Sequence, residues 1–154
     1  MSGPRSVAVD ARGWPRFWDE ERETLDPARR DHLILDRIRH QLQYVYAELP
    51  FYRRLYHAHG FHPDQVRSLE DFTTKVPVIT KKMLVADQQE HPPFGSYARP
   101  LPAGEIARIH GSSGTSGVPT MYAVSRGDWE RAGEVHAMAQ WCAGVRPDDI
   151  VQVG

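Results

Sequence analysis

The stretch 108–124, RIHGSSGTSGVPTMYAV, decides how this chain is organised. Apolar, β-prone residues occupy both of its ends, and they predict strands at 105–110 (EIARIH) and at 121–124 (MYAV). The residues between these strands, 112–120, are mostly Gly, Ser and Thr, with Pro119 near the exit. A flexible Gly/Ser linker would have a similar composition, but a linker separates domains, whereas this loop joins two neighbouring apolar segments. The sequence therefore predicts a structured loop between two strands.

The loop 112–120 has the composition of an anion-binding loop. Glycines 111, 114 and 117 allow positive φ angles and a close approach of the backbone to a ligand. Successive backbone N–H groups in such a loop form a concavity that binds anions. Hydroxyl groups able to donate to phosphate oxygens come from Ser112, Ser113, Thr115, Ser116 and Thr120. The loop therefore predicts a polyphosphate site.

Two common phosphate-binding motifs do not describe this loop. A Walker A motif requires Gly-Lys followed by Ser or Thr, but Gly117 is followed by Val118 and Pro119. The glycine spacing also differs from the G-x-G-x-x-G pattern, which follows a strand and opens a helix. The predicted polyphosphate site is therefore of another kind.

Helices are predicted before the loop. Asp26 and Pro27 favour a helix start, and apolar residues then recur every three or four positions up to Leu49. Pro50 ends this helix or starts the next, which is aromatic and is stopped by Gly60. Two short helices are expected after Ser68 and Thr80. The segment 91–104, HPPFGSYARPLPAG, is predicted to be a rigid loop.

After the second strand, Ser125 and Asp128 predict a capped helix that ends at Gly144. IVQVG at 150–154 is expected to begin a buried strand, which needs neighbouring strands. We therefore expect this chain to be the N-terminal portion of a longer α/β protein. The face of the helix that is expected to be buried consists of Trp129, Ala132, Val135, Ala139 and Cys142.

Composition and charge exclude several classes of protein. Apolar residues make up 40% of the chain and charged residues 25%, which argues against disorder. The formal net charge of −1 disfavours a general nucleic-acid binder. The sequence shows no secretory signal and no apolar run long enough to span a membrane, so a cytoplasmic protein without a membrane partner is expected.

Cysteine and histidine give weaker indications. The single cysteine, Cys142, excludes an internal disulfide and is expected to be a buried thiol. The eight histidines lack the spacing of zinc ligands, so no metal-ligating residues are predicted. His110, two residues before the loop, is a candidate for a phosphate contact, although a structural role is favoured.

The segment SSGTSGVPT resembles the phosphate loop of the adenylate-forming superfamily of acyl-CoA synthetases, and in particular that of its phenylacetate–CoA ligase branch. The strand-into-loop segment RIHGSSGT and the loop end at Thr120 resemble that branch. Four upstream segments occur in the same order and at similar distances as in that branch. These are PFYRRLY, SLEDF, VPVITKK and PFGSY, and the resemblance extends from about residue 33 to residue 154.

The resemblance implies both fold and activity. The chain would be part of the large N-terminal domain, with a helical segment followed by the start of a mixed sheet and flanking helices. The family activates a carboxylic acid with ATP to an acyl-adenylate, with Mg²⁺ bound to the phosphates, and then transfers the acyl group to coenzyme A. Contacts to the β- and γ-phosphates are implied for Ser112, Ser113, Gly114, Thr115, Ser116, Gly117 and Thr120.

The change of composition along the chain, together with the resemblance, predicts three parts. Residues 1–24 are expected to form a loosely ordered arm anchored by Trp14, Phe17 and Trp18. Residues 25–104 would form a helical subregion with the Pro-rich loop, and 105–154 the start of the ATP-binding α/β subdomain. The family's catalytic lysine, acyl pocket and Mg²⁺-binding acidic residue would lie beyond residue 154, so the chain alone is expected to be inactive.

Two features of the loop depart from the family pattern. Ser116 replaces a frequent threonine but keeps the hydroxyl, and Val118 replaces a frequent lysine, which removes a cation near the phosphates. The sequence leaves open which carboxylic acid is activated and whether the protein is a homodimer. Two alternatives also stay open: an adenylating enzyme with a different acyl acceptor, and a truncated interaction module without catalytic activity.

Overall fold

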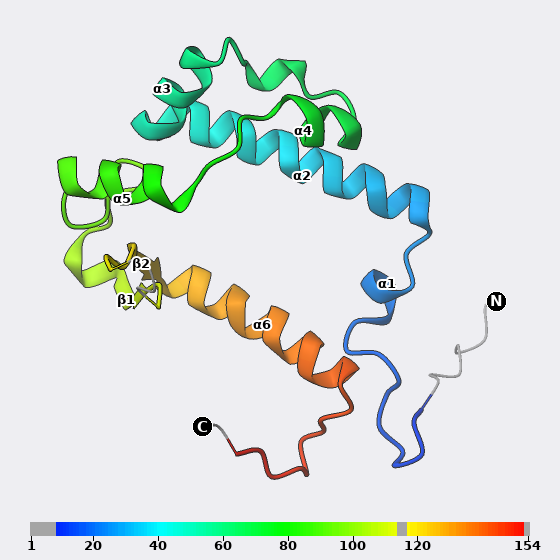
Figure 1. The fold of residues 1–154 in the computed structure, drawn as a ribbon. Coiled ribbons are helices and arrows are strands. Elements are labelled where there is room, and N and C mark those ends of the chain that lie inside the picture. Colours follow the sequence, from blue (N-terminus) through cyan, green and yellow to red (C-terminus); the bar gives the residue numbers. More distant parts are fainter. Residues whose placement is uncertain (1–8, 114–116, 153–154) are drawn as a thin grey trace. The chain divides into compact units, whose positions relative to one another are not determined.

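The structure is a computed structural model of the 154-residue chain, and it describes residues 9–113 and 117–152 (Figure 1). These residues belong to two compact units. One unit is Pro27–Trp129, and the other combines the described residues before position 27 with those from Glu130 onward. The division into 1–24, 25–104 and 105–154 stays a prediction.

The unit Pro27–Trp129 begins with helices whose ends are set by local sequence. As predicted, the helix α2 (Pro27–Glu48) begins at Pro27, and α3 (Pro50–Ala58) begins at Pro50, so this second proline starts a helix. Ser68 and Thr80 cap the next two helices, because their hydroxyls accept from the backbone N–H of Asp71 and Met83. The helices are α2 (Pro27–Glu48), α3 (Pro50–Ala58), α4 (Leu69–Lys75) and α5 (Lys81–Glu90), with 3₁₀ turns at Pro63–Gln65 and Ala103–Glu105.

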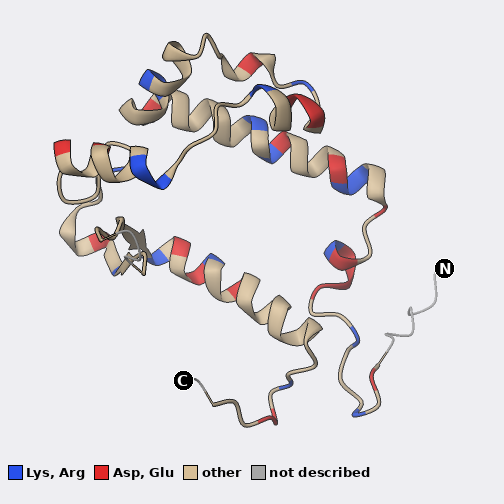
Figure 2. Cartoon of the chain, in the orientation of Figure 1, with Lys and Arg blue, Asp and Glu red and all other residues tan. Residues whose placement is uncertain are grey.

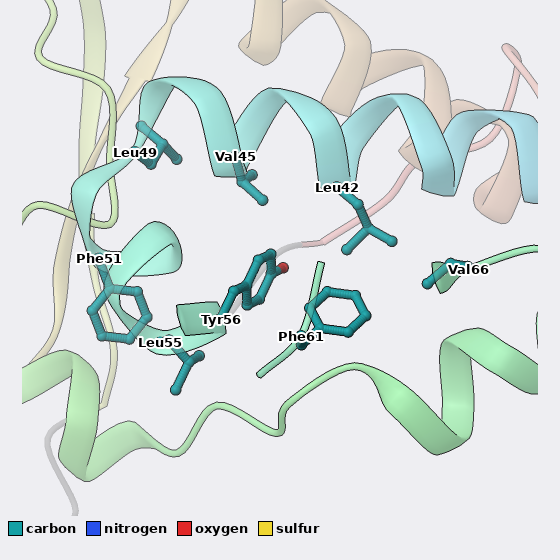
Figure 3. Packing of buried hydrophobic residues seen from close by; sticks show 8 residues of the cluster. All are labelled: Leu42, Val45, Leu49, Phe51, Leu55, Tyr56, Phe61 and Val66. Atoms are coloured by element: carbon teal, nitrogen blue, oxygen red, sulfur yellow. The ribbon is translucent and has the colours of Figure 1, made fainter. Parts of the chain in front are cut away.

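A hydrophobic core joins α2 and α3 to the segment that follows them (Figure 3). The predicted apolar face of α2 contributes to it, since Leu42, Val45 and Leu49 are buried. Tyr56 of α3 is only 2% exposed, and its ring lies 4.8 Å from that of Phe61. The core consists of Leu42, Val45, Leu49, Phe51, Leu55, Tyr56, Phe61 and Val66.

The predicted strands form an antiparallel pair. Strand β1 (Ile106–Gly111) pairs with β2 (Met121–Ser125), and Gly111 lies opposite Met121 at the end nearest the loop. The helix α6 (Arg126–Cys142) follows β2 directly. The predicted fold class is confirmed, because a helical segment precedes the start of a sheet with a flanking helix.

The predicted buried face of α6 is wrong. Trp129 is 41% exposed and Val135 is 66% exposed, whereas Trp141 is the buried residue among those described in this helix. Cys142 is exposed, so the expected buried thiol is also wrong. Helical periodicity identifies residues that share a face but not the segment that covers it. Here the covering segment lies more than a hundred residues away in the sequence.

No strand is present at 150–152, the described part of the predicted strand 150–154. Ile150 is fully exposed. A strand requires hydrogen bonds to a neighbouring strand, and the described part of the chain supplies none here.

The N-terminal arm docks on the end of α6 in the second unit. Residues 135–142 carry no Lys, Arg, Asp or Glu (Figure 2). The rings of Trp14 and Trp18 lie 6.2 and 5.5 Å from that of Trp141, and the Trp141 indole donates to the Pro15 carbonyl at 2.9 Å. The predicted anchoring by Trp14 and Trp18 is confirmed, while Phe17 lies beneath the Arg16 guanidinium. A short helix, α1 (Glu20–Glu23), completes the arm.

Two ion pairs fasten the arm to the turn after α6. Arg12 donates to Asp149 at 2.7 Å, and the buried guanidinium of Arg146 donates to Asp10 at 2.8 Å. Arg146 also stacks 4.2 Å from the ring centroid of Trp141. The arm is therefore held by aromatic contacts and by carboxylates that must be ionised.

Acidification is expected to loosen the arm. The hydrogen bond from Arg12 lowers the pKa of Asp149 below its ordinary value of 3.8, so the pair stabilises the docked arm above that pH. This stabilisation is lost as the pH falls through the lowered pKa. Tryptophan fluorescence should report the release, because Trp14, Trp18 and Trp141 meet at this contact. A variant with both Asp10→Asn and Asp149→Asn should lack the acid step, and an unchanged step would contradict this account.

None of the helices that the structure describes combines the length and the apolar character needed to cross a membrane.

Candidate functional site

The loop 112–120 is closed at its base. The backbone N–H of Ser112 donates to the carbonyl of Thr120 at 3.0 Å, and the backbone N–H of Thr120 donates to Ser112 Oγ at 3.0 Å. The first of these bonds continues the ladder of β1 and β2 by one step, and the second is accepted by the Ser112 side chain. The first and last residues of the loop are therefore fixed relative to each other.

For two of the three glycines named from the sequence, the structure shows why a glycine is required. Gly117 has a φ of +93°, a conformation that residues with a Cβ rarely adopt. At Gly111 the reason is space, because a Cβ there would lie 2.9 Å from Met121 Sδ. Gly114, Thr115 and Ser116 lie outside the described residues.

The described side chains leave hydroxyl donors for an anion. Ser112 Oγ accepts from Thr120, so its own proton is still able to point elsewhere. Ser113 is exposed, and Thr120 is half-buried. Because the backbone N–H groups of Ser112 and Thr120 bond within the loop, these two positions offer hydroxyls and not amides to a ligand.

The end of the loop, residues 119–121, is held by residues that the sequence did not indicate as functional. Gln88 of α5 accepts from the backbone N–H of Met121 at 2.7 Å and donates to the carbonyl of Pro119 at 3.3 Å. The Tyr97 hydroxyl lies 3.1 Å from the carbonyl of Met121 and 3.0 Å from Gln88 Oε1. Burial, followed by the charge of Asp87, raises the pKa of Tyr97, which keeps this phenol a donor.

The segment carrying Tyr97 is fixed by the buried carboxylate of Asp87. Its oxygens accept from the Ser96 backbone N–H at 2.6 Å, from the Ser96 hydroxyl at 2.7 Å and from Arg54 at 2.6 Å. Gly95 has a φ of +77°, and a Cβ there would lie 2.3 Å from the Tyr97 ring. The helix α5 and the segment around Ser96 thus form one hydrogen-bonded support beside the loop.

His110 has aromatic neighbours. Its ring stacks on Tyr122 with centroids 5.7 Å apart and lies 5.8 Å from the ring of Trp129. The guanidinium of Arg108 lies 4.3 Å from the centroid of the Trp129 ring. These contacts favour the structural role for His110.

Among the described residues, no group of three or more His, Cys, Asp or Glu side chains is arranged to hold a metal ion. The described hydroxyl groups of the loop, those of Ser112, Ser113 and Thr120, are able to donate to phosphate oxygens.

Comparison with curated proteins finds phenylacetate-coenzyme A ligases. The chain is 39% identical over 131 residues to the enzyme of Thermus thermophilus. This alignment covers 85% of this chain and 28% of the relative. It is 35% identical over 121 residues to the Escherichia coli enzyme, covering 79% of this chain and 26% of the relative. No family model matches the chain.

Comparison with solved structures finds a different CoA ligase. A 2-hydroxyisobutyryl-CoA ligase in complex with 2-HIB-AMP and CoA matches with a TM-score of 0.81 and 43% identity, over 92% of this chain and 29% of that chain. An open conformation of this ligase matches with a TM-score of 0.80 and 39% identity, over 97% of this chain and 33% of that chain. The chain therefore spans less than a third of the length of the curated relatives that it matches.

Proposed function

Because the chain corresponds to the N-terminal portion of ligases of the phenylacetate–CoA ligase branch, we propose that it carries the triphosphate-binding loop of an ATP-dependent, AMP-forming acid–CoA ligase. The loop 112–120 binds the β- and γ-phosphates of ATP. The contacts are made by Ser112, Ser113, Gly114, Thr115, Ser116, Gly117 and Thr120.

The reaction proposed for the whole ligase has two steps. A carboxylate oxygen attacks the α-phosphorus of ATP, and the bond to the β-phosphate oxygen breaks, so that pyrophosphate leaves and an acyl-adenylate remains. The sulfur of coenzyme A, whose thiol gives up its proton, then attacks the acyl carbon, and AMP leaves with the electron pair of the broken C–O bond. The first step places negative charge on the departing pyrophosphate.

The loop assists the first step by stabilising this developing charge. Donors that are already in place stabilise a leaving group without reorganisation at the moment of reaction. The hydroxyls of Ser113 and Thr120, together with the free proton of Ser112, supply such donors on a loop closed at its base. Mg²⁺ would supply further charge neutralisation on the phosphates.

The observation that carries the proposal is the closed, glycine-containing loop between paired strands, in a chain 43% identical to a ligase solved with an acyl-AMP and CoA. The relatives are named for two different acids, the aromatic phenylacetate and the small 2-hydroxyisobutyrate. We therefore propose an aromatic or other small carboxylic acid as the substrate. A cytoplasmic location and a homodimer stay predictions.

Isotope exchange between pyrophosphate and ATP in the complete gene product tests this function. With Mg²⁺ and phenylacetate or 2-hydroxyisobutyrate, we expect exchange that depends on the acid, and release of AMP that depends on coenzyme A. Exchange without thioester formation would indicate a different acceptor. Absence of exchange with every acid in a broad carboxylate screen would contradict the proposal and favour a module without catalytic activity.

A further inference from the structure

Gln88 contacts the backbone on both sides of Thr120, the last residue of the loop. Its Oε1 accepts from the N–H of Met121 at 2.7 Å, and its Nε2 lies 3.3 Å from the carbonyl oxygen of Pro119. One amide side chain from α5 thus spans the three residues through which the loop returns to β2.

The chemistry of these neighbours fixes the orientation of the Gln88 amide. A backbone N–H needs an acceptor, and a carbonyl needs a donor. Rotating the amide by half a turn would set two donors against each other at Met121 and two acceptors at Pro119. The orientation observed is therefore the one in which both contacts are hydrogen bonds.

The support behind Gln88 is itself fixed. Asp87, the preceding residue, is buried and accepts two hydrogen bonds from Ser96, and Tyr97 places its hydroxyl 3.0 Å from Gln88 Oε1. The Tyr97 proton serves either Gln88 or the carbonyl of Met121, which lies 3.1 Å away. The segment that carries Gln88 is therefore held by hydrogen bonds, which a residue that positions another residue requires.

We propose that Gln88 is a positioning residue for the triphosphate. By holding the backbone at Pro119 and Met121, it sets the direction in which the Thr120 hydroxyl and the loop exit face the β- and γ-phosphates. This inference rests on the proposed function of the loop. Gln88 acts through Thr120, and nothing in its role requires contact with the substrate.

Replacing Gln88 by leucine should impair ATP use selectively. Leucine has a similar size but cannot form either hydrogen bond, so the loop exit loses its support. In pyrophosphate–ATP exchange by the complete gene product, the KM for Mg-ATP should rise roughly tenfold, the size expected from losing one or two hydrogen bonds. The KM for the carboxylic acid should stay unchanged, because the loop does not bind the acid.

The adjacent Gln89→Leu variant is the matched control. Gln89 lies on the same helix, is exposed and has the same side chain, so its replacement should leave the KM for Mg-ATP unchanged. A Gln88→Leu variant that lowers kcat while every KM stays the same would indicate a smaller folded fraction and would overturn the positioning role. An unchanged KM for Mg-ATP would overturn it as well.

Amide hydrogen exchange gives a readout that does not require turnover. The N–H of Met121 bonds to Gln88, so exchange in the peptide 117–125 should accelerate in Gln88→Leu and stay unchanged in Gln89→Leu. Mg-ATP should slow this exchange in the wild-type protein and much less in Gln88→Leu. If no acid supports pyrophosphate exchange but this pattern holds, the proposed activation of an acid fails, whereas triphosphate binding by the loop and the role of Gln88 stand. Equal protection by Mg-ATP in both proteins would contradict the role of Gln88.

Discussion

Replacing Ser113 by alanine in the complete gene product is expected to slow acid-dependent pyrophosphate–ATP exchange by about 10- to 150-fold. A hydrogen bond to a charged group contributes about 1.5–3 kcal/mol, and each 1.36 kcal/mol corresponds to about a factor of ten. The exposed hydroxyl of Ser113 is available for such a bond. Thr115→Ala is expected to have an effect of the same size.

A hydroxyl outside the loop provides the control. Thr73 of α4 is exposed and donates to the carbonyl of Glu70, so Thr73→Ala should leave the exchange rate unchanged. Ser113→Ala should also retain the melting temperature of the wild-type protein, because Ser113 is exposed and does not belong to the hydrophobic core. Wild-type exchange rates in both loop variants would contradict a phosphate-binding role for the loop.

The largest effect on stability is expected for Tyr56→Ala. Tyr56 is 2% exposed and lies in the core between α2 and Phe61 (Figure 3). Replacing a buried aromatic residue by alanine removes apolar burial and leaves a cavity, which typically lowers the free energy of unfolding by about 3–5 kcal/mol. Urea denaturation followed by circular dichroism measures this change. A decrease below about 1 kcal/mol would contradict the packing described for Tyr56.

Tyr56→Phe separates the hydroxyl from the ring. Burial raises the pKa of Tyr56 from 10.0 to about 12, so the neutral phenol stabilises the fold fully below pH 10. This stabilisation is lost as the pH rises from 10 toward 12. The alkaline decrease in stability should therefore be smaller in Tyr56→Phe than in the wild-type protein. Equal alkaline decreases would indicate that other groups account for the loss.

Local sequence signals predicted the parts of the fold that depend on neighbouring residues. Pro27 and Pro50 begin helices because their fixed φ and missing N–H suit the first turn, and Ser68 and Thr80 cap helices through their hydroxyls. The strands on both sides of the loop followed from their composition. The resemblance to the phenylacetate–CoA ligase branch, made on short segments in a fixed order, is confirmed by the relatives.

Contacts between distant segments could not be predicted in the same way. The residue of α6 that becomes buried is Trp141, because Trp14 and Trp18 of the arm reach it, and helical periodicity carries no information on that partner. Gln88 was missed for a similar reason. A single polar residue on a half-exposed helix forms no pattern, and the backbone N–H that Gln88 binds lies 33 residues later in the chain.

A crystal structure of the complete gene product with Mg²⁺ and a non-hydrolysable ATP analogue tests the central proposal most directly. We expect oxygens of the β- and γ-phosphates within about 3.2 Å of hydroxyl or backbone N–H groups of residues 112–120, the distance of a hydrogen bond. Phosphates bound by other residues, with no contact to this loop, would contradict the proposal.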